Sequence, residues 1–451
     1  MKKFNVTGTC IPHLNYMVDL TPKLLQIKEM VDSGDYFTIN RGQQYGKTTT
    51  LLALENFIIP EYAVISLSLE GIGVSPFECE EKFVQTFLSL VQDSLEMSGQ
   101  SNAELWWNEE VKDFKSLGRH IRKVCQNSEK KFVLLIDEVD KASNYQVFLQ
   151  FLGKLRDKYL AQRAGKDFTF HSVILAGVHD IKNLRFQVMN ENETTPSGSY
   201  HSPWNISADF NIRMSFSVDE ISGMLREYIA STHVIMDIFE VASEIHTYTN
   251  GYPVLVSNIC KKIDEKLDKD WTSGGVRRAV KLILKEENPL FETLIKNISA
   301  NESLESLLRS VIDRKAIMFN IHNPALNLCY RYGYISDVKD KVKISNKIFE
   351  VILMNYFASQ LEISKILKST PLNNDESGII VNNQFNMDLC LQKFSAYFNK
   401  YYDTKDERFI ERQGRLLFLM FLAPLLNGQG FAYILNSRFY TTRSGPFDSK
   451  V

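Results

Sequence analysis

Short apolar segments alternate with longer stretches of helical periodicity over the first half of the chain. Continuous or alternating apolar residues predict five strands, which are Tyr36–Asn40, Ala63–Leu69, Phe132–Ile136, His171–Val178 and Phe210–Phe216. Apolar residues spaced three or four positions apart predict helices between them, at Thr48–Phe57, Pro76–Met97, Phe114–Cys125 and Tyr145–Tyr159. Strands that alternate with helices form βαβ units with right-handed crossovers, so an α/β fold with a mostly parallel sheet is expected.

The loop after the first strand has the composition of a phosphate-binding loop. Gly46, Lys47 and Thr48 stand where this loop runs into a predicted helix. Gly46 lets backbone N–H groups curl toward a phosphate, and the helix N-terminus adds the positive end of its dipole. Lys47 would reach the outer phosphates as a catalytic and binding group, and the Thr48 hydroxyl would ligate Mg²⁺. The residues expected to bind the nucleotide are Arg41, Gly42, Gln43, Gln44, Tyr45, Gly46, Lys47, Thr48 and Thr49.

This loop departs from the usual pattern G-x-x-x-x-G-K-[ST] at one position. Arg41 occupies the first glycine position, and Gly42 stands one residue late. A Gly-Lys-Thr sequence also occurs in ordinary turns between a strand and a helix. The loop by itself therefore leaves both interpretations open.

A second motif favours the nucleotide site. Five apolar residues, Phe132–Ile136, predict a strand buried on both faces. Asp137 follows at the carboxyl end of that strand, where open α/β sheets bind ligands, and would hold Mg²⁺. Glu138 would be the catalytic base that polarises the attacking water. A core strand that ends in a charged turn is the alternative. A glutamate after the aspartate suits the division of P-loop proteins with a further strand between the two motif strands.

Taken together, these motifs resemble those of the bacterial AAA-like ATPases, P-loop NTPases related to the archaeal ATPase and STAND groups. The resemblance covers about residues 1–270 and is carried by Asn15–Asp19, Phe37–Arg41, Gln44–Thr49, Leu135–Asp140, Ile174–Leu184, Ser202–Ile206 and Gly251–Pro253. It implies ATP and Mg²⁺ as ligands, and it makes Arg41 a family trait. It also implies that Pro253 begins a helix over the nucleotide base. A proline at the first position of an ordinary helix is a compatible reading.

The resemblance implies two further kinds of site residue. Related ATPases place a polar residue that senses the γ-phosphate at the end of the strand predicted at His171–Val178. His179 or Asp180 would take that part, although Asp180 fits equally well as the cap of a helix that starts at Ile181. The candidates for an arginine finger are Arg41, Arg185, Arg213 and a residue of a neighbouring subunit.

Composition limits the partners and the compartment. The chain has 451 residues, and 52 Lys and Arg against 54 Asp and Glu give a net charge of −2. No global positive field therefore favours nonspecific binding of nucleic acid. Six scattered cysteines without zinc spacing suit a reducing cytoplasm. The most apolar window, Leu416–Leu426, is too short to span a bilayer and predicts a buried helix, so no membrane partner is expected.

Two smaller domains are predicted after the ATPase core. An all-helical lid is expected at Val218–Ile229, Met236–Thr247 and Val254–Leu267, with a capping box formed by Ser217 and Glu220. A winged helix is expected next, with helices Leu304–Arg314, Pro324–Tyr332 and Lys347–Phe357 and strands Gly333–Asp337 and Lys341–Asn346. The residues that make it mildly basic are Arg331, Lys339, Lys341, Lys343 and Lys347. It would either contact a DNA backbone or pack on the ATPase as an interaction module.

The last segment resembles the start of a PD-(D/E)XK nuclease-like domain, which many members of the resembled family carry. Glu411 matches the first acidic residue of that pattern, and Asp448 is the candidate for the second. The acid-x-Lys strand that should follow to hold Mg²⁺ is missing before Val451. We therefore expect no nuclease activity from this chain. An incomplete domain would expose strand edges and apolar surface, so pairing with a protein partner or a second copy, or aggregation, is a risk.

These observations combine into one expected organisation: an ATPase core at 1–216, a helical lid at 217–285, a winged-helix-like domain at 286–360, a linker at 361–386 and a partial nuclease-like domain at 387–451. The expected function is that of a Mg²⁺-dependent ATPase that works as a nucleotide-driven conformational switch. The alternative is a DNA-binding or protein-interaction adaptor with little ATP turnover.

Overall fold

A computed structural model describes residues 2–100, 103–178, 185–187, 199–201, 203–313, 315–360, 380–381, 384–401, 432–435 and 438–441. The chain divides into two compact units. The first unit comprises Met1–Leu290 together with Asn327–Tyr334, and the second comprises Phe291–Leu326 and Ile335–Val451. The expected domain boundaries inside these units stay predictions.

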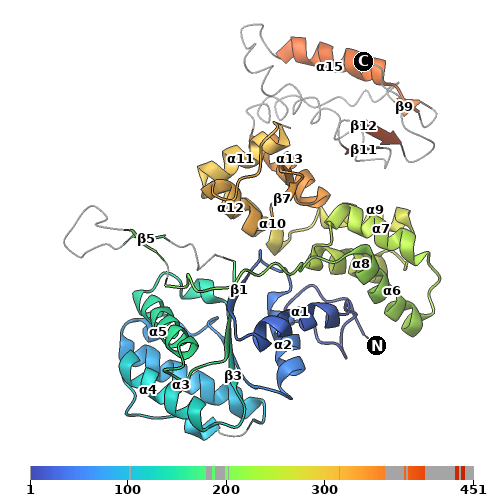
Figure 1. The fold of residues 1–451 in the computed structure, drawn as a ribbon. Coiled ribbons are helices and arrows are strands. Elements are labelled where there is room, and N and C mark those ends of the chain that lie inside the picture. The colour runs from blue at the N-terminus through green and yellow to red at the C-terminus, as the bar shows by residue number, and fades with distance from the viewer. Residues whose placement is uncertain are drawn as a thin grey trace. The chain divides into compact units, whose positions relative to one another are not determined.

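A parallel sheet of four strands forms the centre of the first unit (Figure 1). Its strands are β1 (Tyr36–Asn40), β2 (Ala63–Ser68), β3 (Phe132–Asp137) and β4 (Ser172–Gly177). They lie in the order β1-β4-β3-β2, and all three pairings are parallel. Four of the five predicted strands are therefore confirmed. The strand order also confirms that a further strand, β4, separates the two strands that carry the motifs.

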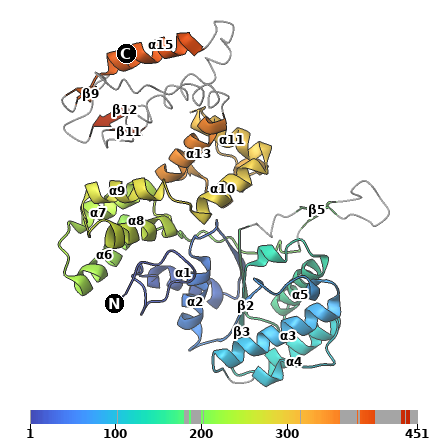
Figure 2. The ribbon, with the colours of Figure 1, turned by 180° about the vertical axis from the view of Figure 1, so that it is seen from behind.

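Helices cover both faces of this sheet (Figures 1 and 2). One face packs against α1 (Thr21–Asp32) and α2 (Lys47–Ile58). The other packs against α3 (Glu80–Met97), α4 (Phe114–Asn127) and α5 (Gln146–Arg163). Adjacent β1 residues illustrate the division, because Tyr36 joins the α3–α5 core and Phe37 joins the α1–α2 core. Each strand is buried on both sides, which explains its continuous apolar sequence.

The predicted strand at Phe210–Phe216 is wrong, because this segment pairs with none of the strands among the described residues. Its backbone groups bond elsewhere: the Phe216 N–H donates to the Gly251 carbonyl at 2.8 Å, and the Ile212 carbonyl accepts from the Arg41 guanidinium at 3.2 Å. Ile212 and Met214 are buried, so the alternation records an extended connector with one covered face. Alternating apolar residues indicate which side chains are buried, but they do not show which partners the backbone N–H and carbonyl groups bind.

The helix predicted from Pro76 begins later, at Glu80. A short 3₁₀ turn, η1 (Ser75–Phe77), precedes it, and Cys79 then adopts an extended backbone that separates the two. Apolar periodicity runs through both segments, so it places this helix start four residues early. The other three predicted helices of the core lie within a few residues of α2, α4 and α5.

Four helices follow the sheet: α6 (Val218–Thr232), α7 (Ile238–Thr249), α8 (Pro253–Lys266) and α9 (Ser273–Ile283). We call them the helical subdomain. The capping box predicted at the start of α6 is confirmed, with reciprocal bonds between Ser217 and Glu220. The N-terminal residues pack on this subdomain, because the rings of Phe4 and Tyr16 lie 5.3 and 5.2 Å from that of Tyr228.

The elements expected at residues 286–360 are present from α11 onward, and they lie in the second unit except for the end of α12. These are α11 (Glu302–Ile312), α12 (Pro324–Arg331), β7 (Ile335–Val338), β8 (Lys341–Ile344) and α13 (Lys347–Gln360), preceded by α10 (Pro289–Ser299). Residues 327–331 of α12 belong to the first unit. β7 and β8 form an antiparallel hairpin whose turn residues, Lys339 and Asp340, have φ of 55° and 62°. Met318 adds a bridge to Lys341.

The remaining described elements are short. They are β5 (Arg185–Gln187), β6 (Ser199–His201), β9 (Ile380–Val381), β10 (Gln384–Phe385), α15 (Met387–Tyr401), β11 (Ala432–Leu435) and β12 (Arg438–Thr441). Several residues predicted from sequence lie outside the described part: His179, Asp180, Glu411, Asp448 and Leu416–Leu426. None of the helices in the described part combines the length and the apolar character that a membrane span requires.

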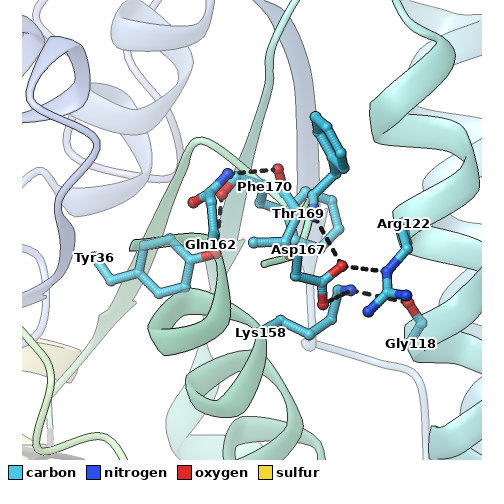
Figure 3. A network of polar contacts seen from close by, with 9 residues as sticks. Tyr36, Gly118, Arg122, Lys158, Gln162, Asp167, Thr169 and Phe170 are labelled. Carbon is cyan, nitrogen blue, oxygen red and sulfur yellow. Dashed lines mark hydrogen bonds and ion pairs between the residues drawn. The ribbon is translucent and has the colours of Figure 1, made fainter. Parts of the chain in front are cut away.

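A buried ion pair holds α5 to the segment that leads into β4 (Figure 3). The Lys158 ammonium lies 2.8 Å from the Asp167 carboxylate and also donates to the Gly118 carbonyl of α4 at 2.9 Å. The Asp167 carboxylate also accepts from Arg122. Burial raises the pKa of the Asp167 carboxyl, but the bonds from Arg122 and Lys158 outweigh it and leave that pKa below its usual value. The pair therefore holds the segment before β4 to α4 and α5.

We predict that Asp167→Asn lowers the free energy of unfolding by about 3 kcal/mol, because it leaves the buried Lys158 ammonium without its counter-charge. Since the folded pKa of Asp167 is lowered, the wild-type contribution is present above a pH of about 4 and is lost as the pH falls further. Urea unfolding followed by the fluorescence of buried Trp106 measures it. Asp157→Asn, the same change on the exposed side of α5, is the control. Equal midpoints for both variants would contradict the assignment.

Candidate functional site

The loop between β1 and α2 has the backbone of a phosphate-binding loop. Two of its residues adopt left-handed conformations, Gln44 with φ 54° and Gly46 with φ 80°. Gly46 is also the N-cap of α2, so the first N–H groups of that helix have no partner within the helix and point toward the loop. A Cβ on Gly46 would meet no atom within 4 Å, so its backbone conformation is what requires glycine.

Lys47 begins α2 and is buried, with 6 % of its surface exposed. Its ammonium donates to the carbonyls of Arg41 and Gly42 at 3.0 and 3.1 Å. Burial lowers the pKa of Lys47, while the carboxylates of Glu138, Asp140 and Asp137 act in the opposite direction. The first half of the loop is therefore folded around this ammonium.

A hydrogen bond joins the two motifs predicted from sequence. The Thr48 hydroxyl donates to Oδ2 of Asp137 at 2.6 Å. Asp137 ends β3 and is 6 % exposed, and its Oδ1 accepts the Glu138 N–H at 2.9 Å. A hydroxyl and a carboxylate at this separation are hard oxygen donors of the kind that Mg²⁺ prefers.

The donor set suits a magnesium ion that shares its ligands with phosphate. No group of three or more His, Cys, Asp or Glu side chains in the described ranges is placed to hold a metal ion. Mg²⁺ bound with a nucleotide needs only one or two carboxylates, because the phosphates and waters complete its shell. Thr48 and Asp137 meet that requirement.

Glu138 stands beside this pair in a strained backbone. Its φ of 54° is unusual for a residue with a side chain and costs about 1 kcal/mol. Burial raises the pKa of the Glu138 carboxyl, and the negative charge of Asp137 raises it further. A half-buried carboxyl with a raised pKa and a strained backbone is typical of a catalytic base.

Asp140 closes the end of β4, a role that the sequence did not reveal. Its carboxylate accepts the Val178 N–H, and a Cβ on Gly177 would lie 2.8 Å from its Oδ2. The η3 turn (Val139–Lys141) thus joins the ends of β3 and β4. An acidic residue three positions after Asp137 was the available signal, but its partner is set by the strand order.

Arg41 is bound to backbone carbonyls. Its guanidinium donates to the Asn40 carbonyl at 2.8 Å and to the Ile212 carbonyl at 3.2 Å, and it lies 5.7 Å from the centre of the Phe210 ring. It fastens the end of β1 to the 210–216 connector. Arg213, another candidate for an arginine finger, is exposed and donates to Ser215 at 2.9 Å.

A cavity opens beside the loop, between the N-terminal segment and the helical subdomain. The loop contributes Gln44, Tyr45 and Gly46, α2 contributes Thr49, and the subdomain contributes Pro253 and Val254 among others. The N-terminal segment forms another wall, with Asn5, Val6, Gly8, Cys10, Tyr16, Met17, Val18 and Leu20. Three residues of the sequence motif at 15–19, Tyr16, Met17 and Val18, therefore line the cavity, a role that the sequence did not reveal.

The Gly251–Pro253 motif adjoins this cavity and contacts the loop. Gly251 has φ 73°, and a Cβ there would overlap the Phe216 carbonyl at 1.9 Å, so both conformation and space require glycine. Pro253 is the first residue of α8, as predicted. The Tyr252 hydroxyl donates to the Gln43 carbonyl at 2.6 Å, which ties the helical subdomain to the loop.

Comparisons with known proteins bear on the family and the fold. A profile described as an AAA-like domain matches residues 16–358. The fold is similar to that of a Walker-type ATPase of Pyrococcus abyssi, with a TM-score of 0.51, 12% identity and coverage of 78% of this chain and 99% of that one. No curated protein sequence is significantly similar to the chain.

Weaker structural matches also occur. Cdc6p of Pyrobaculum aerophilum matches with a TM-score of 0.36, 14% identity and coverage of 79% and 98%. The RuvB Holliday junction branch migration motor of Thermotoga maritima matches with a TM-score of 0.35, 12% identity and coverage of 74% and 95%. Neither adds to the argument at that level of similarity. The profile match, which extends over most of the sequence and includes both motifs, shows that the chain belongs to the AAA-like domain family.

Proposed function

We propose that the chain binds ATP with Mg²⁺, hydrolyses it, and uses the nucleotide state to move the helical subdomain. The observation that carries the proposal is the 2.6 Å bond between Thr48 and Asp137, because it brings the phosphate loop and the acidic motif to one point at the carboxyl end of the sheet. Ligands of open α/β sheets bind at that edge. The AAA-like fold supports the same reading.

The side chains take distinct parts in this proposal. Lys47 exchanges its carbonyl partners for the outer phosphates, and the N–H groups around Gly46 bind the phosphate oxygens. Thr48 and Asp137 hold Mg²⁺, which when bound neutralises charge that develops on the phosphates. The base enters the cavity between Pro253 and the N-terminal segment.

Glu138 is proposed as the base that orients and deprotonates the attacking water. Its raised pKa places it nearer to neutral pH than an ordinary glutamate, which makes it a better proton acceptor there. Its backbone, bonded to Asp137 Oδ1, fixes it next to the metal ligand. The helical subdomain then acts as a lid, because two adjacent residues at the start of α8 reach the site. Tyr252 binds the loop, and Pro253 lines the cavity.

We predict that Glu138→Gln retains ATP binding and lowers the turnover number by about 10²- to 10⁴-fold, because the amide cannot accept the proton. In the parent, turnover falls as the pH drops through the raised pKa of Glu138, since only the carboxylate is active, and the glutamine variant lacks this dependence. Phosphate release at saturating ATP measures both. Glu109→Gln, at an exposed acid, is the control. Equal turnover of parent and Glu138→Gln would remove Glu138 from the mechanism.

Lys47→Ala is expected to weaken ATP binding by about 10- to 100-fold, which corresponds to the loss of a charged hydrogen bond to phosphate. Titration with a fluorescent ATP analogue in the presence of Mg²⁺ measures the affinity. Lys141→Ala removes an exposed ammonium close to the same motif and should leave the affinity unchanged. Wild-type affinity in Lys47→Ala would refute the phosphate site.

A DNA-binding or protein-interaction adaptor with little ATP turnover is the second candidate function. The observation that favours DNA is the β7–β8 hairpin, where Lys339, Lys341 and Lys343 are all exposed. Exposed lysines on a hairpin beside α13 fit the wing of a winged helix, which contacts phosphates. A tightly bound nucleotide with undetectable phosphate release would support the adaptor function.

For this candidate we predict that the parent binds a labelled DNA duplex at low salt and that Lys341→Ala with Lys343→Ala weakens binding. The slope of log affinity against log salt should fall by about 2, one for each phosphate contact. Lys296→Ala with Lys315→Ala removes the same charge elsewhere in the second unit. Equal binding by both double variants would leave a protein partner as the target of the hairpin.

A further inference from the structure

Residues 327–334 have an unusual place in the chain. They belong to the first unit, although the residues on both sides of them belong to the second. They comprise the end of α12 and the turn before β7. The chain therefore returns to the nucleotide-binding unit for eight residues.

The segment approaches the phosphate loop at Gly42. A Cβ on Gly42 would lie 2.4 Å from the Tyr332 carbonyl oxygen and 3.0 Å from the carbonyl carbon. Both atoms belong to backbone and cannot rotate away. Gly42 is not among the glycines with a left-handed backbone, so its own conformation does not require glycine. The approach of Tyr332 is what excludes a side chain at this position.

Aromatic rings extend this contact. The Tyr45 ring of the loop and the Tyr252 ring of the helical subdomain meet edge to face, with centroids 4.5 Å apart. A Cβ on Gly333 would lie 3.4 and 3.5 Å from their Cε2 atoms. Tyr252 and Tyr334 are 2 and 4 % exposed. We call Tyr45, Tyr252 and residues 332–334 the tyrosine clasp, because three parts of the chain meet there.

The clasp contacts the half of the loop that must rearrange around phosphate. Lys47 binds the carbonyls of residues 41 and 42, and Tyr252 binds the next carbonyl, that of Gln43. Burial raises the pKa of Tyr252 well above its usual value, so its hydroxyl keeps the proton that it donates. Three consecutive carbonyls are thus fixed, and Tyr332 covers the middle one of these residues.

The cavity shares its walls with the same elements. Tyr45 and Gly46 line it from the loop, and Pro253 and Val254 line it from α8, directly after Tyr252. A nucleotide base held there would lie between the loop and α8, which are the two elements that the clasp bridges.

We propose that the tyrosine clasp gates nucleotide exchange: docking of residues 332–334 on Tyr45, Tyr252 and Gly42 holds the loop and the helical subdomain together, and release of the segment speeds both entry and departure of the nucleotide. This inference rests on the proposed nucleotide site. Because the segment continues into the second unit on both sides, any partner that pulls it from the loop changes the exchange rate.

Three variants of the full chain test the proposed gate by changing the loop, the start of α8 and the 332–334 segment in turn. Gly42→Ala places a methyl group against the Tyr332 carbonyl, and Tyr252→Phe removes the bond to Gln43. Gly333→Ala acts from the segment without altering the loop, through a φ of 73° and the two nearby rings. Gly73→Ala, with φ 72°, and Gly223→Ala are matched controls, since a Cβ at either meets no atom within 4 Å.

Two measurements give the outcome. Stopped-flow with a fluorescent ADP analogue gives the association and dissociation rates, and hydrogen exchange reports opening at residues 327–334. We expect dissociation to rise about fivefold in Tyr252→Phe, the effect of one hydrogen bond, and about tenfold in Gly333→Ala, from the strain of a left-handed side chain. Association should rise by a similar factor, so that the dissociation constant changes little, and exchange at 327–334 should increase. The controls should match the parent.

Other outcomes overturn the proposal. A rise in the dissociation constant with unchanged or slower association would show damage to the site and no gate. Faster hydrogen exchange at 327–334 with parental nucleotide rates would show that docking and nucleotide exchange are independent. Parental values in both measurements would show that the segment does not hold the loop. A parent chain that binds no nucleotide would overturn the proposed function as well, whereas the other outcomes leave it standing.

Discussion

The hydrogen bond between Thr48 and Asp137 is the contact on which the arrangement of the site depends. It spans from the start of α2 to the end of β3, and β4 lies between β1 and β3 in the sheet. The bond can form only if the three strands end at the same edge and in register, which the parallel pairing provides. Two cores, one on each face, and the ion pair at Lys158 maintain that register. The stability of the sheet and the geometry of the site are thus one constraint.

Charge at this edge also follows from the fold. Asp137, Glu138 and Asp140 gather around the single ammonium of Lys47, so acidic groups outnumber the basic one within the motif. Burial makes the ionised form of these carboxyl groups less stable, and the pKa of Glu138 is raised as a result. A bound cation would relieve the repulsion between the carboxylates, and phosphates would meet Lys47 and the backbone N–H groups. The proposed metal–nucleotide complex would therefore balance the charges at this edge.

Much of this could be predicted from the sequence, because local rules decide it. Strands buried on both faces leave continuous apolar runs, as at Phe132–Ile136, and the capping box of Ser217 needs only a spacing of three. Contacts between residues that are distant in the sequence could not be predicted from it. The connector at 210–216 has the alternation of a strand, but its partners, Arg41 and Gly251, lie far away in the chain. The role of Asp140 depends on strand order, and that of Tyr252 on the packing of two subdomains.

The shifted glycine of the loop illustrates why pattern matching alone stops short. In the usual motif both glycines are attributed to the loop's own backbone. Here Gly46 has that role, with a left-handed φ and free space around it, whereas Gly42 has an ordinary backbone and is limited by Tyr332, 290 residues later. A glycine that is required by the close approach of another residue must lie where that residue approaches. The residue before the glycine can then carry a side chain. Arg41 uses that freedom to fasten β1 to the 210–216 connector, so the departure from the motif is a consequence of what packs against the loop.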